Sequence, residues 1–157
     1  MWLMSKIIND KDVIKIFKEH EVVLITGSFD VLHLGHLRFF SSVKTQISND
    51  VKVLLVILSD NEIQRRKGTN RPIFNQDERA EALSHLETID YIHKWQSSWE
   101  DLRKFVVEMQ PEYLAVVEGD PGIVNKKEVI ESIGGKLIIV KKTDDFSSSG
   151  IIQKLGL

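Results

Sequence analysis

The chain contains no cysteine, which excludes disulfide bonds, thiolate-bound metals and cysteine nucleophiles. It has no apolar run of about 18 residues or more, and its first residues lack the basic, apolar and small-residue order of a secretion signal. Neither sign of charge dominates, since 21 Lys and Arg stand against 23 Asp and Glu. We therefore expect a cytoplasmic protein with no membrane or nucleic-acid partner, in which any phosphate site depends on a local cluster of charge.

Short apolar runs alternate with helical patterns along the 157 residues. This alternation is typical of βαβ units that build a parallel sheet, and the length suits one domain. We therefore predict a single Rossmann-like α/β domain over residues 1–157, with a parallel five-stranded sheet flanked by helices. The predicted strands are 22–25, 51–58, 91–93, 113–117 and 137–140.

A tight turn joins the strand predicted at 22–25 to a helix predicted at 34–43. Gly27 ends the apolar run, and apolar residues recur at helical spacing from the start of the second segment. Gly35 and His36 therefore fall at a helix N-terminus. Free backbone N–H groups and the positive end of the helix dipole favour phosphate at such a place.

Two histidines, His33 and His36, stand three residues apart in this turn, so both rings can face the same phosphate. Two imidazole N–H donors there would stabilise the charge that develops during phosphoryl transfer. Loss of one comparable donor costs about 2.7–4 kcal/mol in other enzymes. The alternative is a structural turn in which the histidines only pack, and the strand and helix on either side favour the phosphate site.

Residues 27–36 resemble the signature of the cytidylyltransferase-like nucleotidyltransferase superfamily. A second block resembles, without gaps, the bacterial heptose-1-phosphate adenylyltransferases of lipopolysaccharide core synthesis. That block comprises Ser59-Asp60, Lys67-Gly68, Arg71-Pro72-Ile73 and Glu78-Arg79. Gly119-Asp120 and residues 146–149 resemble the family's nucleotide-contacting segment and helix start, so the likeness covers about residues 22–155.

The resemblance implies transfer of a nucleotide to a small phosphorylated acceptor, with His33, His36 and Lys67 as the catalytic residues. The implied nucleotide-binding residues are Gly27, Ser28, Phe29, Asp30, His33, Gly35, His36, Arg79, Gly119, Asp120, Ser147, Ser148 and Ser149. The nucleotide is ATP or CTP. Mg²⁺ is expected to accompany it, held by phosphates and water without metal-ligating residues of the protein. The sequence leaves open whether the protein forms a homodimer.

Patterns alone leave alternatives at several of these positions. The cations within 64–72 fit either a loop that folds over a triphosphate or a solvated loop, and 68–75 has the turn residues of a mobile segment. Arg79 fits either a phosphate ligand or a surface charge on a helix. Gly119-Asp120 also fits an ordinary turn, and the serines at 147–149 fit an ordinary helix cap.

The chain departs from the family pattern at three positions, which leaves recognition of the base and ribose open. Glu118 and Pro121 flank the Gly-Asp pair, and Lys142 stands where cytidylyltransferases carry arginine. ATP with a heptose-like sugar 1-phosphate is the favoured substrate pair. The segment Lys142-Thr143-Asp144 also resembles CTP-dependent glycerol-3-phosphate cytidylyltransferases, and a flavin-mononucleotide adenylyltransferase is a further alternative. A nucleotide-binding protein without turnover is the alternative of another class.

Overall fold

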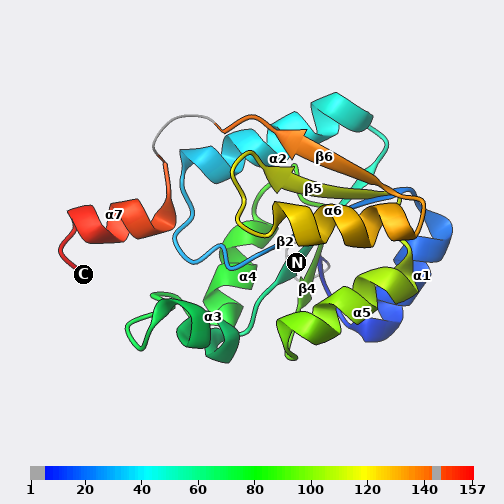
Figure 1. The fold of residues 1–157 in the computed structure, drawn as a ribbon. Helices are drawn as coiled ribbons and strands as arrows, with labels where there is room; N and C mark the ends of the chain where they lie inside the picture. Colours follow the sequence, from blue (N-terminus) through cyan, green and yellow to red (C-terminus); the bar gives the residue numbers. More distant parts are fainter. Residues whose placement is uncertain (1–5, 143–145) are drawn as a thin grey trace.

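The computed structural model describes residues 6–142 and 146–157, and helices alternate with strands along most of them (Figure 1). The elements are, in chain order, β1 (Ile7–Ile8), α1 (Asp10–Glu19), β2 (Val22–Gly27), α2 (Leu34–Ile47), β3 (Lys52–Ile57), α3 (Asp60–Lys67), α4 (Gln76–Ser84), β4 (Tyr91–Lys94), α5 (Trp99–Met109), β5 (Tyr113–Val117), α6 (Ile123–Ser132), β6 (Lys136–Val140) and α7 (Ser148–Lys154). Within these two ranges no helix combines the length and the apolar composition of a membrane span.

The strands form one parallel sheet in the order β1-β4-β3-β2-β5-β6. This confirms the predicted α/β class with a parallel sheet, but the sheet has six strands, so the predicted number of five is wrong. The additional strand is β1, whose two residues pair with Ile92 and His93 of β4. Two apolar residues are too few to show the length or the periodicity by which a strand is recognised in a sequence.

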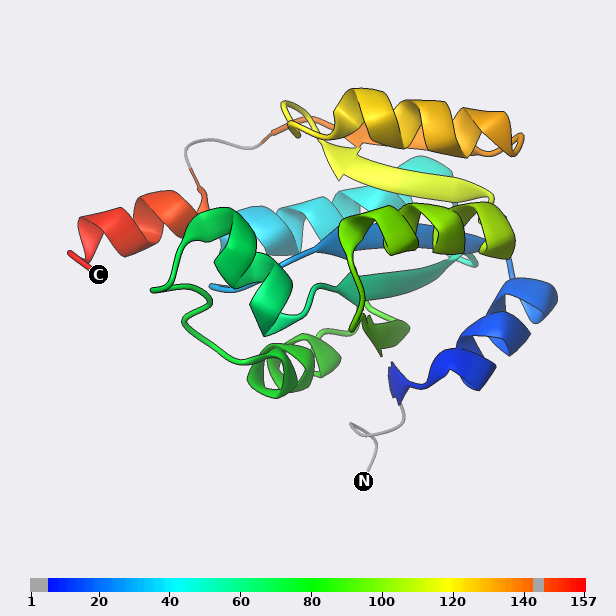
Figure 2. The same cartoon turned by 60° about the horizontal axis from the view of Figure 1, so that its bottom comes forward.

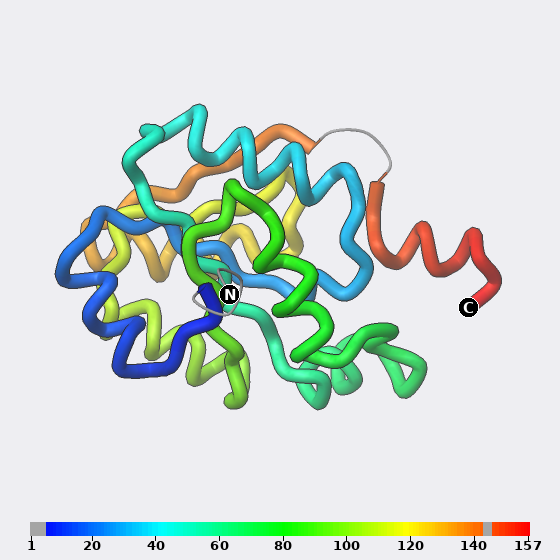
Figure 3. Tube along the Cα trace, turned by 180° about the vertical axis from the view of Figure 1, so that it is seen from behind, coloured from blue at the N-terminus to red at the C-terminus, as the bar shows by residue number. Residues whose placement is uncertain are grey.

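Helices cover both faces of the sheet. In Figure 1, α5 and α6 lie in front of it, and the view from behind shows α2 and α4 over the opposite face (Figure 3). The side chains of β2 alternate accordingly: Val23 and Ile25 belong to the core that contains Phe40 of α2. Val22 and Leu24 belong to the core on the side of α1, α5 and α6. Burial on both faces explains why these strands are continuous apolar runs.

The winding of the sheet reverses between β2 and β5. From β2 the chain builds β3 and β4 on one side, and it then returns to place β5 and β6 on the other. Open α/β sheets bind ligands outside the carboxyl ends of their strands at such a switch point. The C-terminal helix α7 lies at the side of the molecule away from α1, as Figures 1 and 2 both show.

Candidate active site

A cavity of about 450 Å³ opens at this switch point, between the carboxyl ends of β2, β5 and β6 and the first turns of α2 and α7. Every predicted site residue except Asp30 and Arg79 lines it. The lining members of the predicted set are Gly27, Ser28, Phe29, His33, Gly35, His36, Lys67, Gly119, Asp120, Ser147, Ser148 and Ser149. Segments that lie more than a hundred residues apart in the sequence therefore meet in one cavity.

The two histidines lie against each other at the N-terminus of α2. His33 is the residue before the first helical turn, and its ring stacks on that of His36 with centroids 3.8 Å apart. The backbone N–H of His33 donates to Nδ1 of His36 at 3.4 Å. An Nδ1 that accepts a hydrogen bond leaves the ring proton on Nε2, so His36 has an N–H available as a donor.

Both imidazoles are neutral at pH 7. Burial, followed by the charges of His33 and Lys67, lowers the pKa of His36 to about 3. Burial also lowers the pKa of His33 from its ordinary value of 6.5. A neutral imidazole can donate one hydrogen bond and accept another, so the pair offers oriented N–H donors without adding charge to the cavity.

Two glycines leave the space that this arrangement occupies. A Cβ on Gly35 would lie 3.0 Å from Cε1 of His33 and 3.1 Å from Cβ of Phe146. A Cβ on Gly27 would lie 2.9 Å from the ring of Phe29. That phenylalanine has a φ of 47° and meets His36 edge-on with ring centroids 5.4 Å apart, so the strained turn places an aromatic ring against the His36 imidazole.

Lys67 reaches the cavity from the last turn of α3. Its Nζ donates to Oγ of Ser28 at 3.1 Å. The prediction of a loop over 64–72 is wrong for Gln64 to Lys67, which are helical. The helix forms because Ser59 caps it and Glu62 binds two arginines of its last turn. Burial and then the cation of Arg71 lower the pKa of Lys67, whereas Asp30 raises it.

Asp30 lies behind the cavity wall and anchors the following loop. Its side chain accepts from Nε of Arg71 at 2.6 Å and from the backbone N–H groups of Ile73 and Phe74 at 2.8 and 3.1 Å. Asp30 is only 2% exposed. The part of the 68–75 segment from Arg71 onward is therefore tied to the turn after β2, which differs from the mobile segment that its composition predicts.

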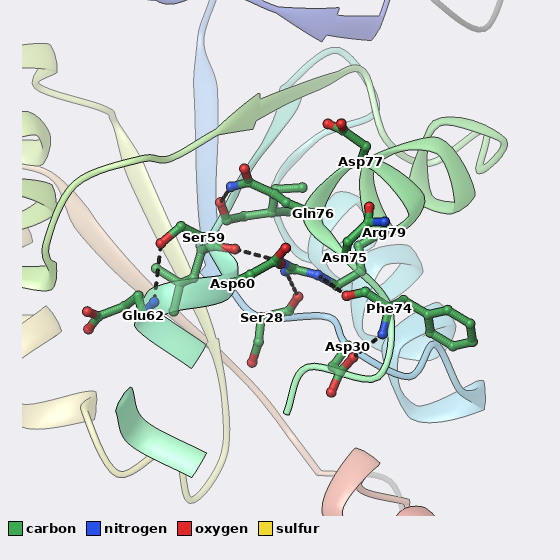
Figure 4. Close-up of polar contacts among 12 residues, drawn as sticks. Ser28, Asp30, Ser59, Asp60, Glu62, Phe74, Asn75, Gln76, Asp77 and Arg79 are labelled. Carbon is green, nitrogen blue, oxygen red and sulfur yellow. Dashed lines mark hydrogen bonds and ion pairs between the residues drawn. The ribbon is translucent and has the colours of Figure 1, made fainter. Parts of the chain in front are cut away.

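Arg79 is also buried behind the wall. Its guanidinium donates to the carbonyls of Ser28, Leu58 and Phe74 and to the carboxylate of Asp60, as Figure 4 shows for its contacts with Ser28, Asp60 and Phe74. The structure does not bring Arg79 to the cavity where the other predicted phosphate ligands lie. Sequence alone gives this arginine no signal of burial, because it stands among charged residues at a helix start.

The Gly119-Asp120 turn and the serines close the other side. Gly119 has a φ of 81°, which favours glycine. Asp120 accepts from the backbone N–H of Gly122 at 2.7 Å and from Nζ of Lys126 at 2.8 Å. Oγ of Ser148 donates to the carbonyl of Val31 at 2.9 Å, which ties α7 to the histidine turn. Ser147 caps α7 by accepting from the N–H of Gly150, as its pattern predicts.

The structure adds two cations that the sequence motifs do not assign to the site. Arg38 and Lys141 line the same cavity together with Lys142. Arg38 lies two residues after His36, within the first turns of α2. This position beside the histidine turn could have indicated that Arg38 belongs to the site. Lys141 directly follows β6, so its place at the carboxyl edge of the sheet follows from the topology.

Comparisons with known proteins agree with this geometry. The family model described as cytidylyltransferase-like matches residues 24–154. Among curated relatives, the bifunctional protein HldE of Geobacter sulfurreducens is 36% identical over 137 residues, which are 85% of this chain and 26% of that protein. HldE of Geobacter metallireducens is 35% identical over 137 residues, 86% of this chain and 27% of that protein. The chain thus spans about a quarter of these relatives.

Solved structures show the same fold. A lipopolysaccharide core biosynthesis protein from Thermoplasma volcanium superposes with a TM-score of 0.62 at 22% identity, over 81% of this chain and 99% of that one. Pantoate-beta-alanine ligase from Francisella tularensis also gives 0.62, at 14% identity, over 92% of this chain and 69% of that one. At these identities the likeness concerns the fold.

Proposed function

Because the chain belongs to the cytidylyltransferase-like family, and is thus a nucleotidyltransferase, we propose that it transfers AMP from ATP to a sugar 1-phosphate of the heptose type. The products are an ADP-sugar and pyrophosphate. One observation carries this proposal: the His33–His36 pair, the Ser28–Lys67 pair and the start of α7 line a single cavity. That cavity offers neutral N–H donors and a cation where a triphosphate would lie.

The reaction needs no covalent enzyme intermediate. An oxygen of the acceptor phosphate attacks the α-phosphorus of ATP and forms the new P–O bond. The bond between the α-phosphorus and its bridging oxygen breaks, and pyrophosphate leaves with the electron pair. The second pKa of a phosphomonoester is about 6, so the nucleophile is already a dianion at pH 7. Positioning and neutralisation of charge then do the work of catalysis, as in other phosphoryl transfers.

We assign the histidines to the α-phosphate and Lys67 to the departing phosphates. Nε2 of His36 carries the available proton, because its Nδ1 accepts from the backbone. Backbone N–H groups in the first turn of α2 add donors, because Gly35 has no side chain of its own to cover them. Lys67, placed by Ser28, would neutralise negative charge as pyrophosphate separates. Ser148 and Ser149 complete the phosphate-binding side of the cavity.

Mg²⁺ is expected to enter with the nucleotide. Across residues 6–142 and 146–157, no group of three His, Asp or Glu side chains is placed to hold a metal ion. Among the described residues, Glu118 and Asp120 are the carboxylates that line the cavity, and Asp120 already accepts from Gly122 and Lys126. These residues do not build a metal cage, so the ion would be held by phosphate oxygens and water, and we assign it no protein ligand.

The choice of acceptor rests on sequence likeness. The relatives are named bifunctional protein HldE, and residues 59–79 resemble the heptose-1-phosphate adenylyltransferases without gaps. The feature that favoured CTP and glycerol 3-phosphate includes Thr143 and Asp144, which lie outside the described residues. On the likeness of residues 59–79 we keep ATP and a heptose-like sugar 1-phosphate as the proposed pair.

A substrate panel tests the function. The protein is incubated with Mg²⁺, each nucleoside triphosphate in turn, and heptose 1-phosphate, glycerol 3-phosphate or flavin mononucleotide, while pyrophosphate release is recorded. We expect turnover with ATP and heptose 1-phosphate. Turnover with a different pair would correct the substrates. No release with any pair, together with saturable ATP binding in calorimetry, would refute the enzyme and indicate a binding protein.

The substitution His36→Ala tests the chemistry. We expect pyrophosphate production to fall by more than tenfold, because an N–H donor to the transition state is lost. His20→Ala is a matched control, since His20 is exposed at the end of α1, and it should leave the rate unchanged. A loss of less than tenfold in the His36 variant, or about 1.4 kcal/mol in the barrier, would refute the assigned role.

A further inference from the structure

Most N–H donors of the Arg79 guanidinium are hydrogen-bonded to other groups of the protein. Arg79 is 2% exposed and makes four hydrogen bonds: to the carbonyls of Phe74 at 3.0 Å, Ser28 at 2.5 Å and Leu58 at 2.8 Å, and to Oδ1 of Asp60 at 2.7 Å. A guanidinium has five N–H donors. Four of the five are therefore used, and little remains for a phosphate.

The four acceptors lie on three segments that are far apart in the sequence. Ser28 belongs to the turn after β2, Leu58 and Asp60 connect β3 to α3, and Phe74 lies in the loop before α4. Figure 4 shows Arg79 reaching between these segments. Only one partner is charged, and Asp60 is 43% exposed at its side chain. A buried cation satisfied mainly by fixed carbonyls depends on the fork of arginine, which lysine does not reproduce.

These contacts act on both members of the Ser28–Lys67 pair. Arg79 holds the carbonyl of Ser28, which fixes the backbone from which the Ser28 hydroxyl meets Nζ of Lys67 at 3.1 Å. It also holds Asp60, the first residue of α3, and Lys67 is the last residue of that helix. One guanidinium thus locks the turn and the helix relative to each other.

We propose that Arg79 is a positioning residue that holds Lys67 and Ser28 at the cavity through the backbone of Ser28 and the start of α3, and that it does not bind the triphosphate. The proposal rests on the proposed function, because it assigns Lys67 a role in turnover. It replaces the phosphate contact that the family resemblance implies for this arginine. Its signature is a fall in kcat without a matching loss of nucleotide affinity.

The test compares Arg79→Lys in the wild-type protein and in a Ser28→Ala background. Ser28→Ala removes the hydroxyl that meets Lys67 but keeps the carbonyl that Arg79 binds. We expect Arg79→Lys to lower kcat for pyrophosphate release at least tenfold, while the Kd of ATP measured by calorimetry changes less than threefold. In the Ser28→Ala background the same substitution should cost less than threefold, because the pair it positions is already broken.

Two results would overturn the proposal. A Kd for ATP weakened tenfold or more with kcat unchanged would make Arg79 a phosphate ligand. An equal loss of kcat in both backgrounds would give it only a general structural role. If Arg79→Lys does not fold, judged by thermal unfolding, Asp60→Ala removes the acceptor of Arg79 on α3 and leaves the three carbonyl contacts in place. It should lower kcat about threefold without changing the Kd, and an unchanged kcat would refute the link. Wild-type protein that releases no pyrophosphate would instead refute the proposed function.

Discussion

Acid should lower the free energy of unfolding, because the buried His36 resists protonation in the folded protein. Burial is the main cause that lowers the pKa of His36 from 6.5 to about 3 in the folded protein, and repulsion from a proton on His33 and from the cation of Lys67 adds to it. Between these two values the unfolded chain binds a proton that the folded chain does not, so stability is complete above about pH 6.5 and is lost as the pH falls. From pH 7 to pH 5, this one group should remove about 2 kcal/mol of the free energy of unfolding.

The assay is urea unfolding of the wild type and of His36→Asn at pH 7 and pH 5. Asparagine retains an oxygen that can accept from the backbone N–H of His33, and it does not titrate. The wild type should lose about 2 kcal/mol more than the variant between the two pH values. Contributions of His33 and His93, whose pKa values burial also lowers, largely cancel in this difference. Equal losses in both proteins would refute the buried, neutral state of His36.

Three further substitutions test neighbouring parts of the site. Gly35→Ala should lower pyrophosphate production at least tenfold, because its Cβ would meet the His33 ring at 3.0 Å; steady-state rates within twofold of wild type would contradict this contact. Asp30→Asn should cost about 3–5 kcal/mol in urea unfolding, because it leaves a buried guanidinium unpaired, and a cost below about 1 kcal/mol would count against the anchor. Lys126→Met should raise the KM for ATP several-fold, since Lys126 holds Asp120 at 2.8 Å, whereas an unchanged KM would separate Asp120 from the nucleotide.

Most of the strands can be predicted from the sequence, because a strand that is buried on both faces is a continuous apolar run. β5 was predicted over the residues that the structure shows, and β2 continues two residues beyond its prediction to Gly27. β1 escaped detection because it is only two residues long. The second half of α3 differs from the loop that its sequence predicts, because its charged surface shows no apolar stripe, and only the Ser59 cap and the Glu62–arginine pairs indicate a helix.

The sequence predicts those site residues whose position depends only on the order of the strands. Gly27 ends β2, and Gly119 and Lys142 follow β5 and β6 of the same sheet, so parallel winding brings them to one cavity. The sequence does not predict which charged side chains are buried, because their hydrogen-bond partners lie far away in the sequence. Arg79 meets the carbonyl of Ser28 across 51 residues, and Asp30 meets Arg71 across 41. Neither partner is marked by local pattern.

The most direct measurement follows both products of one reaction. The protein is mixed with Mg²⁺, ATP and heptose 1-phosphate, and pyrophosphate is quantified by ³¹P nuclear magnetic resonance while the nucleotide-sugar is quantified by mass spectrometry. Direct attack on the α-phosphorus predicts one ADP-sugar for each pyrophosphate, with none of either when the acceptor is omitted. Pyrophosphate that accumulates together with AMP and without ADP-sugar, which means that water has taken the adenylyl group, would contradict the proposed transfer. ATP that binds and stays intact with every phosphorylated acceptor would also contradict it.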